Sequence, residues 1–538
     1  MASVIAPTAP EETQQVEQGA IAAFIDRWRF VLLGLIVVIG AITRFHGLTS
    51  GSLFTDDAWV AITNHESLST ALRMLVTAPG FTLFERFWTG LAPQTTWFAQ
   101  LPNVGSSLAG IVAIYALARY WRYPAWVALI GSAILSISAE STAFATHLKP
   151  YPDDVITAAG LLWLGERARR DLSAKNLAIL GLASVLACAW SFTNAVIVGA
   201  VFTVLLIACL RRRSSLGALA ITVGVAGLFI IGLYLGVIRR EVTPALNQYW
   251  RLSYINTGSL HAFLHSTRAS IDNLIGTELG RSSHHHLVHL AGMLYEYVLL
   301  ALLILGAIVS WRKNAMPLVA IALAYCLAVA HKIPFGSNRT DAYLFPGLIL
   351  IIGAAITWTS RRVKQRAATP VATVAAWGTI TAVTLGLVLS LTNPPGYIGG
   401  DVAKAMPAVN AALQQKGTVL LIEPGTRFVW AYQEDPTATI IFGPSFNTGY
   451  SFVSSRPNVI IVPQTPQEPG FTLAPSIAKL KGATHVVTLG YQMPSAPLDQ
   501  QLTAAALTAA CWVRTSVKSI AGFQVATYDR AGPSCIPQ

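Results

Sequence analysis

The sequence predicts a polytopic α-helical membrane protein with about 11 transmembrane helices and a C-terminal extracytoplasmic α/β domain. Three observations predict this fold class: the composition, a series of long apolar runs, and the basic clusters that alternate between them. Of the 538 residues, 53% are hydrophobic and only 12% are charged, whereas soluble domains carry about 25% charged residues. This composition is typical of a chain that crosses a bilayer repeatedly.

The apolar runs set the number of spans. A transmembrane helix needs about 20 mostly apolar residues. The run 153–166 is short, and 176–210 is either one long region or two helices. The predicted spans are 28–45, 100–118, 124–142, 153–166, 176–193, 194–210, 217–238, 288–310, 315–330, 342–359 and 370–391.

Basic residues mark every second boundary between spans, as the positive-inside rule requires of cytoplasmic loops. These residues are Arg119 and Arg122; Arg167, Arg169, Arg170 and Lys175; Arg211 to Arg213; Arg312 and Lys313; and Arg361, Arg362, Lys364 and Arg366. Eleven spans then place a polar tail, 1–27, in the cytoplasm, where we expect it to be disordered. The same number of spans places the segment 393–538 on the extracytoplasmic side of a plasma membrane. Because the formal charge of +12 follows this topology, we expect no nucleic-acid partner.

The remaining boundaries define four outer segments, and these collect the reactive side chains of the membrane part, 28–392. The outer segments are 46–99, 143–153, 239–287 and 331–341. They bring acids, lysine, arginine and histidine from distant stretches of chain to one face of the membrane. The sequence therefore predicts a site at the outer lipid–water boundary.

The first outer segment carries the adjacent acids Asp56 and Asp57 in "SLFTDDAWVAI". One of them could serve as the N-cap of a helix. A cap needs a single acid, however, and paired carboxylates near a membrane are typical of a general base with a supporting or metal-binding partner. Glu85 and Arg86, in "FTLFERFW", are expected on a surface helix.

The second outer segment reads "HLKPYPDD", residues 147–154. Its prolines end the preceding helix and force an extended turn, from which Lys149 and Tyr151 project. Lys149 is a cation suited to a phosphate, whereas the alternative is a lysine that snorkels to the interface. Asp153 or Asp154 begins the next helix, as an N-cap or as a residue that binds the acceptor.

The last outer segment, "HKIPFGSNRTDAYLFP", offers Arg339 and Asp341 near a glycine. The planar guanidinium matches a phosphate well, and the alternative is a surface ion pair. The histidines at 284–286 and 289 are expected to be solvated.

The C-terminal segment alternates helical and extended patterns. "AMPAVNAALQQ" and "SIAKLKGA" predict helices, and "GTVLLIE", "NVIIVP" and "ATHVVTLGY" predict strands. Cys511 and Cys535 lie in this segment and could form a disulfide outside the cytoplasm. Cys188, Cys209 and Cys326 lie in apolar runs, where cysteine packs as a small apolar residue.

The acids and cations of the outer segments suit a sugar-transfer reaction. Because ATP and nucleotide sugars are absent outside the cell, an enzyme there needs a donor carried by the membrane, such as a polyprenyl-phosphate sugar. A carboxylate would take the proton of the acceptor hydroxyl. A cation, either a side chain or a divalent metal, would stabilise the departing phosphate.

The acidic pair "TDDAW" after the first span, with "KPYPDD" and "GSNRTDAYLFP" in later outer segments, resembles the GT-C superfamily of membrane glycosyltransferases. The types it resembles are the protein O-mannosyltransferases, the aminoarabinose transferases and the actinobacterial arabinosyltransferases. This resemblance implies a GT-C-like fold, a polyprenyl-phosphate sugar donor, and a glycan, lipid or protein acceptor in the cell envelope.

The resemblance also implies roles for individual residues. Asp56 is the first choice as catalytic base, with Asp57 as a supporting residue that could also hold Mg²⁺ or Mn²⁺; no cofactor is certain. Lys149, Tyr151 and Arg339 are assigned to the donor phosphate. The residues assigned to the acceptor or to supporting contacts are His147, Asp153, Asp154 and Asp341.

Three alternatives stay open. A transporter would place charged residues along a path through the membrane, whereas here they collect at one rim. A non-catalytic scaffold would keep the same topology. A lipid-linked glycan ligase or polymerase would depend on Arg240 and His285 in the segment 239–287.

Overall fold

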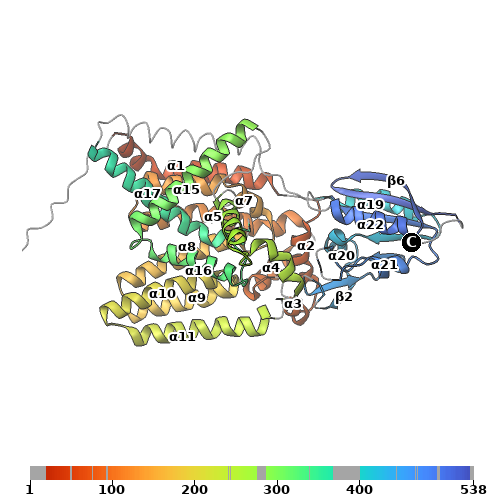
Figure 1. The fold of residues 1–538 in the computed structure, drawn as a ribbon, viewed down its shortest axis with the longest axis horizontal. Coiled ribbons are helices and arrows are strands. Elements are labelled where there is room, and N and C mark those ends of the chain that lie inside the picture. Colours follow the sequence, from red (N-terminus) through yellow and green to blue (C-terminus); the bar gives the residue numbers. More distant parts are fainter. Residues whose placement is uncertain are drawn as a thin grey trace, which may run out of the picture.

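We analysed a computed structural model of the chain. The structure describes residues 20–532 except 49–50, 75–76, 93–94, 240–241, 243, 276–285, 338–339, 367–399, 444, 447, 467, 469 and 493–496. The helices gather in one bundle, and the strands form a separate body at its end, with short helices between the two (Figure 1).

Five described helices are long and apolar enough to cross a membrane. They are α1 (Ala20–His46), α5 (Thr96–Tyr120), α10 (Asn194–Arg212), α11 (Leu216–Leu233), which continues in a π-helical turn to Ile238, and α17 (Phe345–Arg366), whose apolar stretch begins at Ala342. A sixth span results if α6 (Ala125–Ile137) and α7 (Ala139–Ala143), bent by 60° at their junction, count as one. The chain is thus a helical membrane protein, and eleven spans are not confirmed.

The other predicted spans differ in length or polarity. Apolar helices at α9 (Ala174–Trp190), at α16 (Ala315–Val329) and in the C-terminal part of α15 (His286–Ser310) are shorter. The predicted span 153–166 lies in α8 (Tyr151–Arg170), which carries acids in its first turn and arginines in its last. The predicted span 370–391 lies outside the described residues.

Arg44 joins α1 to the bent pair α6–α7. Its guanidinium is fully buried and donates hydrogen bonds to the carbonyls of Leu135 (3.1 Å) and Ser136 (3.2 Å) and to the hydroxyls of Ser107 and Ser141. The carbonyls at the end of α6 have no further helical turn to bond, and in a bilayer no water replaces it. The buried charge of Arg44 is therefore tolerated, because its hydrogen bonds satisfy the carbonyls at the end of α6.

The C-terminal segment forms the predicted α/β domain. Its five-stranded sheet has the order β4-β1-β5-β7-β6, with β1 parallel to β4 and β5, and β7 antiparallel to β5 and β6. The strands are β1 (Thr418–Ile422), β4 (Val459–Ile461), β5 (His485–Tyr491), β6 (Trp512–Ile520) and β7 (Phe523–Arg530); β2 (Thr439–Phe442) and β3 (Tyr450–Val453) pair separately. The helices are α19 (Val402–Leu413), α20 (Arg427–Gln433), α21 (Ala474–Ala478) and α22 (Pro497–Ala509).

The predicted strands "GTVLLIE", "NVIIVP" and "ATHVVTLGY" correspond to β1, β4 and β5. Cys511 is disulfide-bonded, and Cys188, Cys209 and Cys326 are free. The predicted partner, Cys535, lies outside the described residues. A disulfide suits a domain outside the cytoplasm.

The first outer segment packs directly on this domain and lies between it and the bundle (Figure 1). It consists of α2 (Thr55–Ala61), α3 (Leu68–Met74) and α4 (Pro79–Leu91). Leu53 and Phe81 belong to the same buried apolar cluster as Trp430 and Phe452 of the domain. Because one core spans both parts, the domain is fixed on the segment 46–99.

Two hydrogen bonds continue this interface at α2. The Thr55 hydroxyl donates to the carbonyl of Gly425 (2.7 Å), and the Tyr450 hydroxyl donates to the carbonyl of Trp59 (3.1 Å). The helix with the acidic pair is therefore held between the bundle and the domain.

Candidate active site

Asp57 is fully buried in the first turn of α2. Its Oδ1 accepts a hydrogen bond from the backbone amide of Leu148 (2.9 Å), and His147 Nδ1 lies 3.1 Å from both carboxylate oxygens. Phe54 occupies the N-cap position of α2, so neither member of the acidic pair serves as its N-cap. Asp56 is half-buried beside it. The structure thus joins the segments 46–99 and 143–153 through Asp57.

Asn103 of α5 fixes the loop that carries His147 and Lys149. Its side-chain amide donates hydrogen bonds to the carbonyls of both residues, at 2.7 Å for Lys149. Tyr151 is half-buried with its ring against Phe144, at 5.3 Å between centroids. This anchoring holds the loop against Asp57.

Lys149 does not snorkel to an interface. Its side chain is only 6% exposed, and Nζ lies 4.0 Å from the centroid of the Trp59 ring. A cation over an indole face gains electrostatic attraction, more so when water is excluded. The lysine predicted to bind phosphate thus follows directly on Leu148, whose backbone amide bonds Asp57, and lies two residues after His147.

Glu85 corrects the sequence-based interpretation. It was expected on a surface helix, yet it is 1% exposed and neither carboxylate oxygen has a hydrogen-bond partner among the described residues. Burial is the main cause that raises the pKa of Glu85 to about 8, and the negative charges of Asp153 and Asp57 raise it further. Arg86, by contrast, donates to the carbonyls of Thr63 and Glu66.

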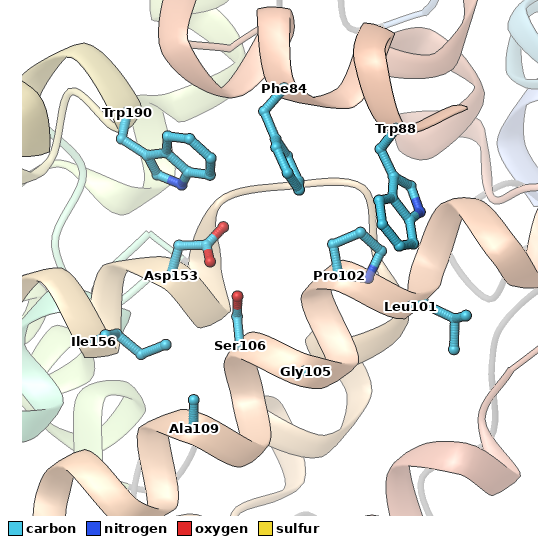
Figure 2. A pocket seen from close by; sticks show the side chains of 10 residues that line it. All are labelled: Phe84, Trp88, Leu101, Pro102, Gly105, Ser106, Ala109, Asp153, Ile156 and Trp190. Atoms are coloured by element: carbon cyan, nitrogen blue, oxygen red, sulfur yellow. The ribbon is translucent and has the colours of Figure 1, made fainter. Parts of the chain in front are cut away.

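The two acids at the start of α8 point in different directions. Asp153 is 8% exposed and accepts hydrogen bonds from the Ser106 hydroxyl and the Trp190 indole (Figure 2). Asp154 is buried, and its Oδ2 accepts from the Thr193 hydroxyl at 3.0 Å. Asp154 therefore connects α8 to the turn before α10, whereas Asp153 faces the acids of the site.

Asp153 also lines a cavity of about 410 Å³ between α4, α5, α8 and α9 (Figure 2). Aromatic rings form one side of this cavity, which we call the side cleft. Its lining residues are Phe84, Trp88, Leu101, Pro102, Gly105, Ser106, Ala109, Asp153, Ile156 and Trp190.

The remaining predicted residues include Asp341, which is held within its own loop, and three that cannot be placed. Asp341 is fully buried, and its Oδ2 accepts from the backbone amide of Ser337 (3.0 Å), so it closes its own loop. Arg339, Arg240 and His285 lie outside the described residues. The predicted phosphate role of Arg339 and the ligase interpretation thus stay predictions.

A metal site does not emerge from the described ranges. Within them, no three His, Cys, Asp or Glu side chains are grouped closely enough to hold a metal ion. The proposed use of Asp57 for Mg²⁺ or Mn²⁺ therefore has no set of supporting ligands in this part of the chain.

No protein-family model and no curated protein matches the chain. The structure is similar to the crystal structure of ArnT from Cupriavidus metallidurans in the apo state, with 14% identity and a TM-score of 0.50 over 95% of this chain and 100% of that one. The crystal structure of ArnT from Cupriavidus metallidurans bound to undecaprenyl phosphate has 15% identity and a TM-score of 0.48, over 94% of this chain and 99% of that one. The apo oligosaccharyltransferase of Archaeoglobus fulgidus has 11% identity and a TM-score of 0.47, over 86% of this chain and 70% of that one. At such an identity the likeness concerns the fold alone, and the chain thus has the fold of ArnT.

Proposed function

We propose that the chain transfers a sugar from a polyprenyl-phosphate donor to an acceptor hydroxyl at the outer face of the plasma membrane. The observation that supports this most is that the buried acids Asp57 and Asp153 both interact electrostatically with the buried Glu85, and that Lys149 follows the Leu148 amide that bonds Asp57. Sugar transfer needs a carboxylate base and a cation for the leaving phosphate in one place. ArnT, which shares the fold, binds undecaprenyl phosphate.

Asp57 is the better candidate for the base than Asp56. It is the member of the pair that lies among the other acids, and the Leu148 amide fixes its orientation. The carboxylate would accept the proton of the acceptor hydroxyl as that oxygen bonds to the anomeric carbon. The bond from this carbon to the phosphate oxygen would break, and polyprenyl phosphate would leave with the electron pair. A single displacement of this kind inverts the anomeric centre.

Lys149 is suited to the leaving phosphate. Negatively charged carboxylates would repel a phosphate, so the donor headgroup must approach from the side that carries the cation. Trp59 holds the ammonium group in place at that side. Tyr151 and Arg339 stay candidates for further contacts with the same phosphate.

Glu85 would be neutral during the reaction. With a pKa raised to about 8, it is protonated at neutral pH and adds no third negative charge. A neutral carboxyl group donates a hydrogen bond, which suits a sugar hydroxyl.

The test uses full-length protein in nanodiscs with a series of polyprenyl-phosphate sugars. Asp57→Asn should lower turnover by about 10³-fold while polyprenyl-phosphate binding is retained, and Asp56→Asn should have a smaller effect. Asp272→Asn, an exposed residue paired with Arg268, is the matched control. Full turnover of Asp57→Asn would remove Asp57 as the base, and loss of turnover in Asp56→Asn alone would assign that role to Asp56.

A further inference from the structure

The side cleft has a fixed aromatic wall. Trp190 and Phe84 lie 5.2 Å apart between ring centroids, and Trp88 stacks on Phe98 at 4.6 Å. The Trp88 indole donates to the carbonyl of Phe98 (2.8 Å). Gly80 permits this packing, because a Cβ there would lie 2.8 Å from the carbonyl oxygen of Ala189. The wall is therefore preformed.

The opposite side of the cleft opens on the flank of α5. Gly105 and Ala109 are exposed, and a Cβ added to Gly105 would meet no atom within 4 Å. Gly105 lies five residues inside the predicted span 100–118, which is about 8 Å along a helix. An opening at this depth faces lipid chains rather than water.

The charge of the cleft excludes one kind of ligand. Among its ten lining residues, Asp153 is the only ionisable one, and it lies close enough to Glu85 for their charges to interact. An acidic cleft that contains no cation disfavours a phosphate headgroup. Its apolar walls fit a hydrocarbon chain, and its carboxylate fits a hydroxyl group.

We propose that the side cleft binds the acceptor, and that this acceptor is a neutral lipid with a free hydroxyl group. Its apolar chain would lie against Gly105 and Ala109, and its hydroxyl group would reach Asp153, whose charge interacts with Glu85. This inference rests on the proposed transferase function. It narrows the acceptor from a glycan, lipid or protein to a molecule that enters from the bilayer.

The experiment separates cleft binding from catalysis. Full-length protein in nanodiscs is irradiated with a diazirine-labelled monogalactosyl diacylglycerol or, in parallel, with diazirine-labelled phosphatidic acid. Labelled peptides are identified by mass spectrometry. Gly105→Phe fills the cleft, and Ala109→Phe is a second variant in case the first does not fold. Gly90→Phe, on the exposed side of α4 where a Cβ also meets no atom, is the matched control.

We expect the neutral probe to label α5 and α8, and Gly105→Phe to reduce this labelling roughly tenfold because the ring occupies the cleft. Polyprenyl-phosphate binding should stay within about twofold of the unmodified protein. Equal labelling in Gly105→Phe and Gly90→Phe, or stronger labelling of the cleft by phosphatidic acid, would overturn the inference. Failure of sugar transfer with cleft labelling intact would instead count against the proposed function.

Discussion

His147 Nδ1 lies 3.1 Å from the Asp57 carboxylate, although the two residues are 90 positions apart in the sequence. The contact fixes one carboxylate of the acidic pair against the loop that carries Lys149.

We expect His147→Ala to lower kcat about tenfold, because Asp57 loses the ring that orients it. Donor KM should change little, since His147 does not face the donor phosphate in our scheme. Steady-state kinetics in nanodiscs measures both values. His147→Gln should recover part of the rate, and His485→Ala, on a half-buried histidine paired with Asp529, should match the unmodified protein. An unchanged kcat in His147→Ala would contradict the positioning role.

Lys149→Met should weaken polyprenyl-phosphate binding by about tenfold, because the methionine keeps the packing on Trp59 but lacks the charge. Binding is measured by titration of the purified protein with polyprenyl phosphate. The control is Lys404→Met, which removes an exposed lysine paired with Asp401. Equal affinity in the two variants would show that Lys149 only supports Trp59.

Glu85 should make the protein less stable as the pH rises. Its pKa is about 8 in the folded protein and 4.5 without burial, so the unfolded chain releases this proton at a lower pH. Between pH 4.5 and 8 the folded state then holds more protons than the unfolded state, and the free energy of unfolding falls as pH increases.

Glu85→Gln should remove this dependence, which amounts to on the order of 5 kcal/mol at most. Thermal unfolding in detergent at pH 5, 6, 7 and 8 measures it. Identical slopes of Tm against pH in the two proteins would show that Glu85 is ionised throughout. Arg86→Gln, on the same helix, controls for changes in packing.

Arg44→Met should destabilise the protein by about 3 kcal/mol, because the carbonyls at the end of α6 would be left without donors inside the membrane. Unfolding in increasing denaturing detergent measures the change. Arg29→Met lies on the same helix, where Arg29 forms a partly exposed ion pair with Asp26, and should have little effect. Comparable stability of both variants would indicate that water reaches the break after Ile137.

The disulfide at Cys511 can be counted chemically. Without reductant, the denatured protein should react with maleimide at Cys188, Cys209 and Cys326 only, and reduction should expose two further thiols. Mass spectrometry of labelled peptides identifies them, and Cys511→Ser should leave Cys535 reactive without reductant. Labelling of Cys511 before reduction would exclude the bond. Loss of the disulfide should lower stability by about 2–4 kcal/mol.

The sequence by itself determined the membrane class and the α/β nature of the C-terminal segment, and it singled out the acidic pair and Lys149 as candidates for the site. These features follow from local patterns, namely apolar runs, alternating strands and charged residues after proline turns. Only the tertiary structure decided that Glu85 is buried. In the sequence it lies on an amphipathic, aromatic helix that is typical of a membrane surface, and its burial depends on the distant segments packed over it.

The same reason applies to the side cleft and to the contact between His147 and Asp57. Whether a cavity forms, or whether a histidine meets a carboxylate, depends on how far apart the helix ends come to lie. That distance is set by packing between segments far apart in the chain, such as Gly80 against the end of α9 and Asn103 against the Lys149 loop. Local sequence patterns do not determine such distances.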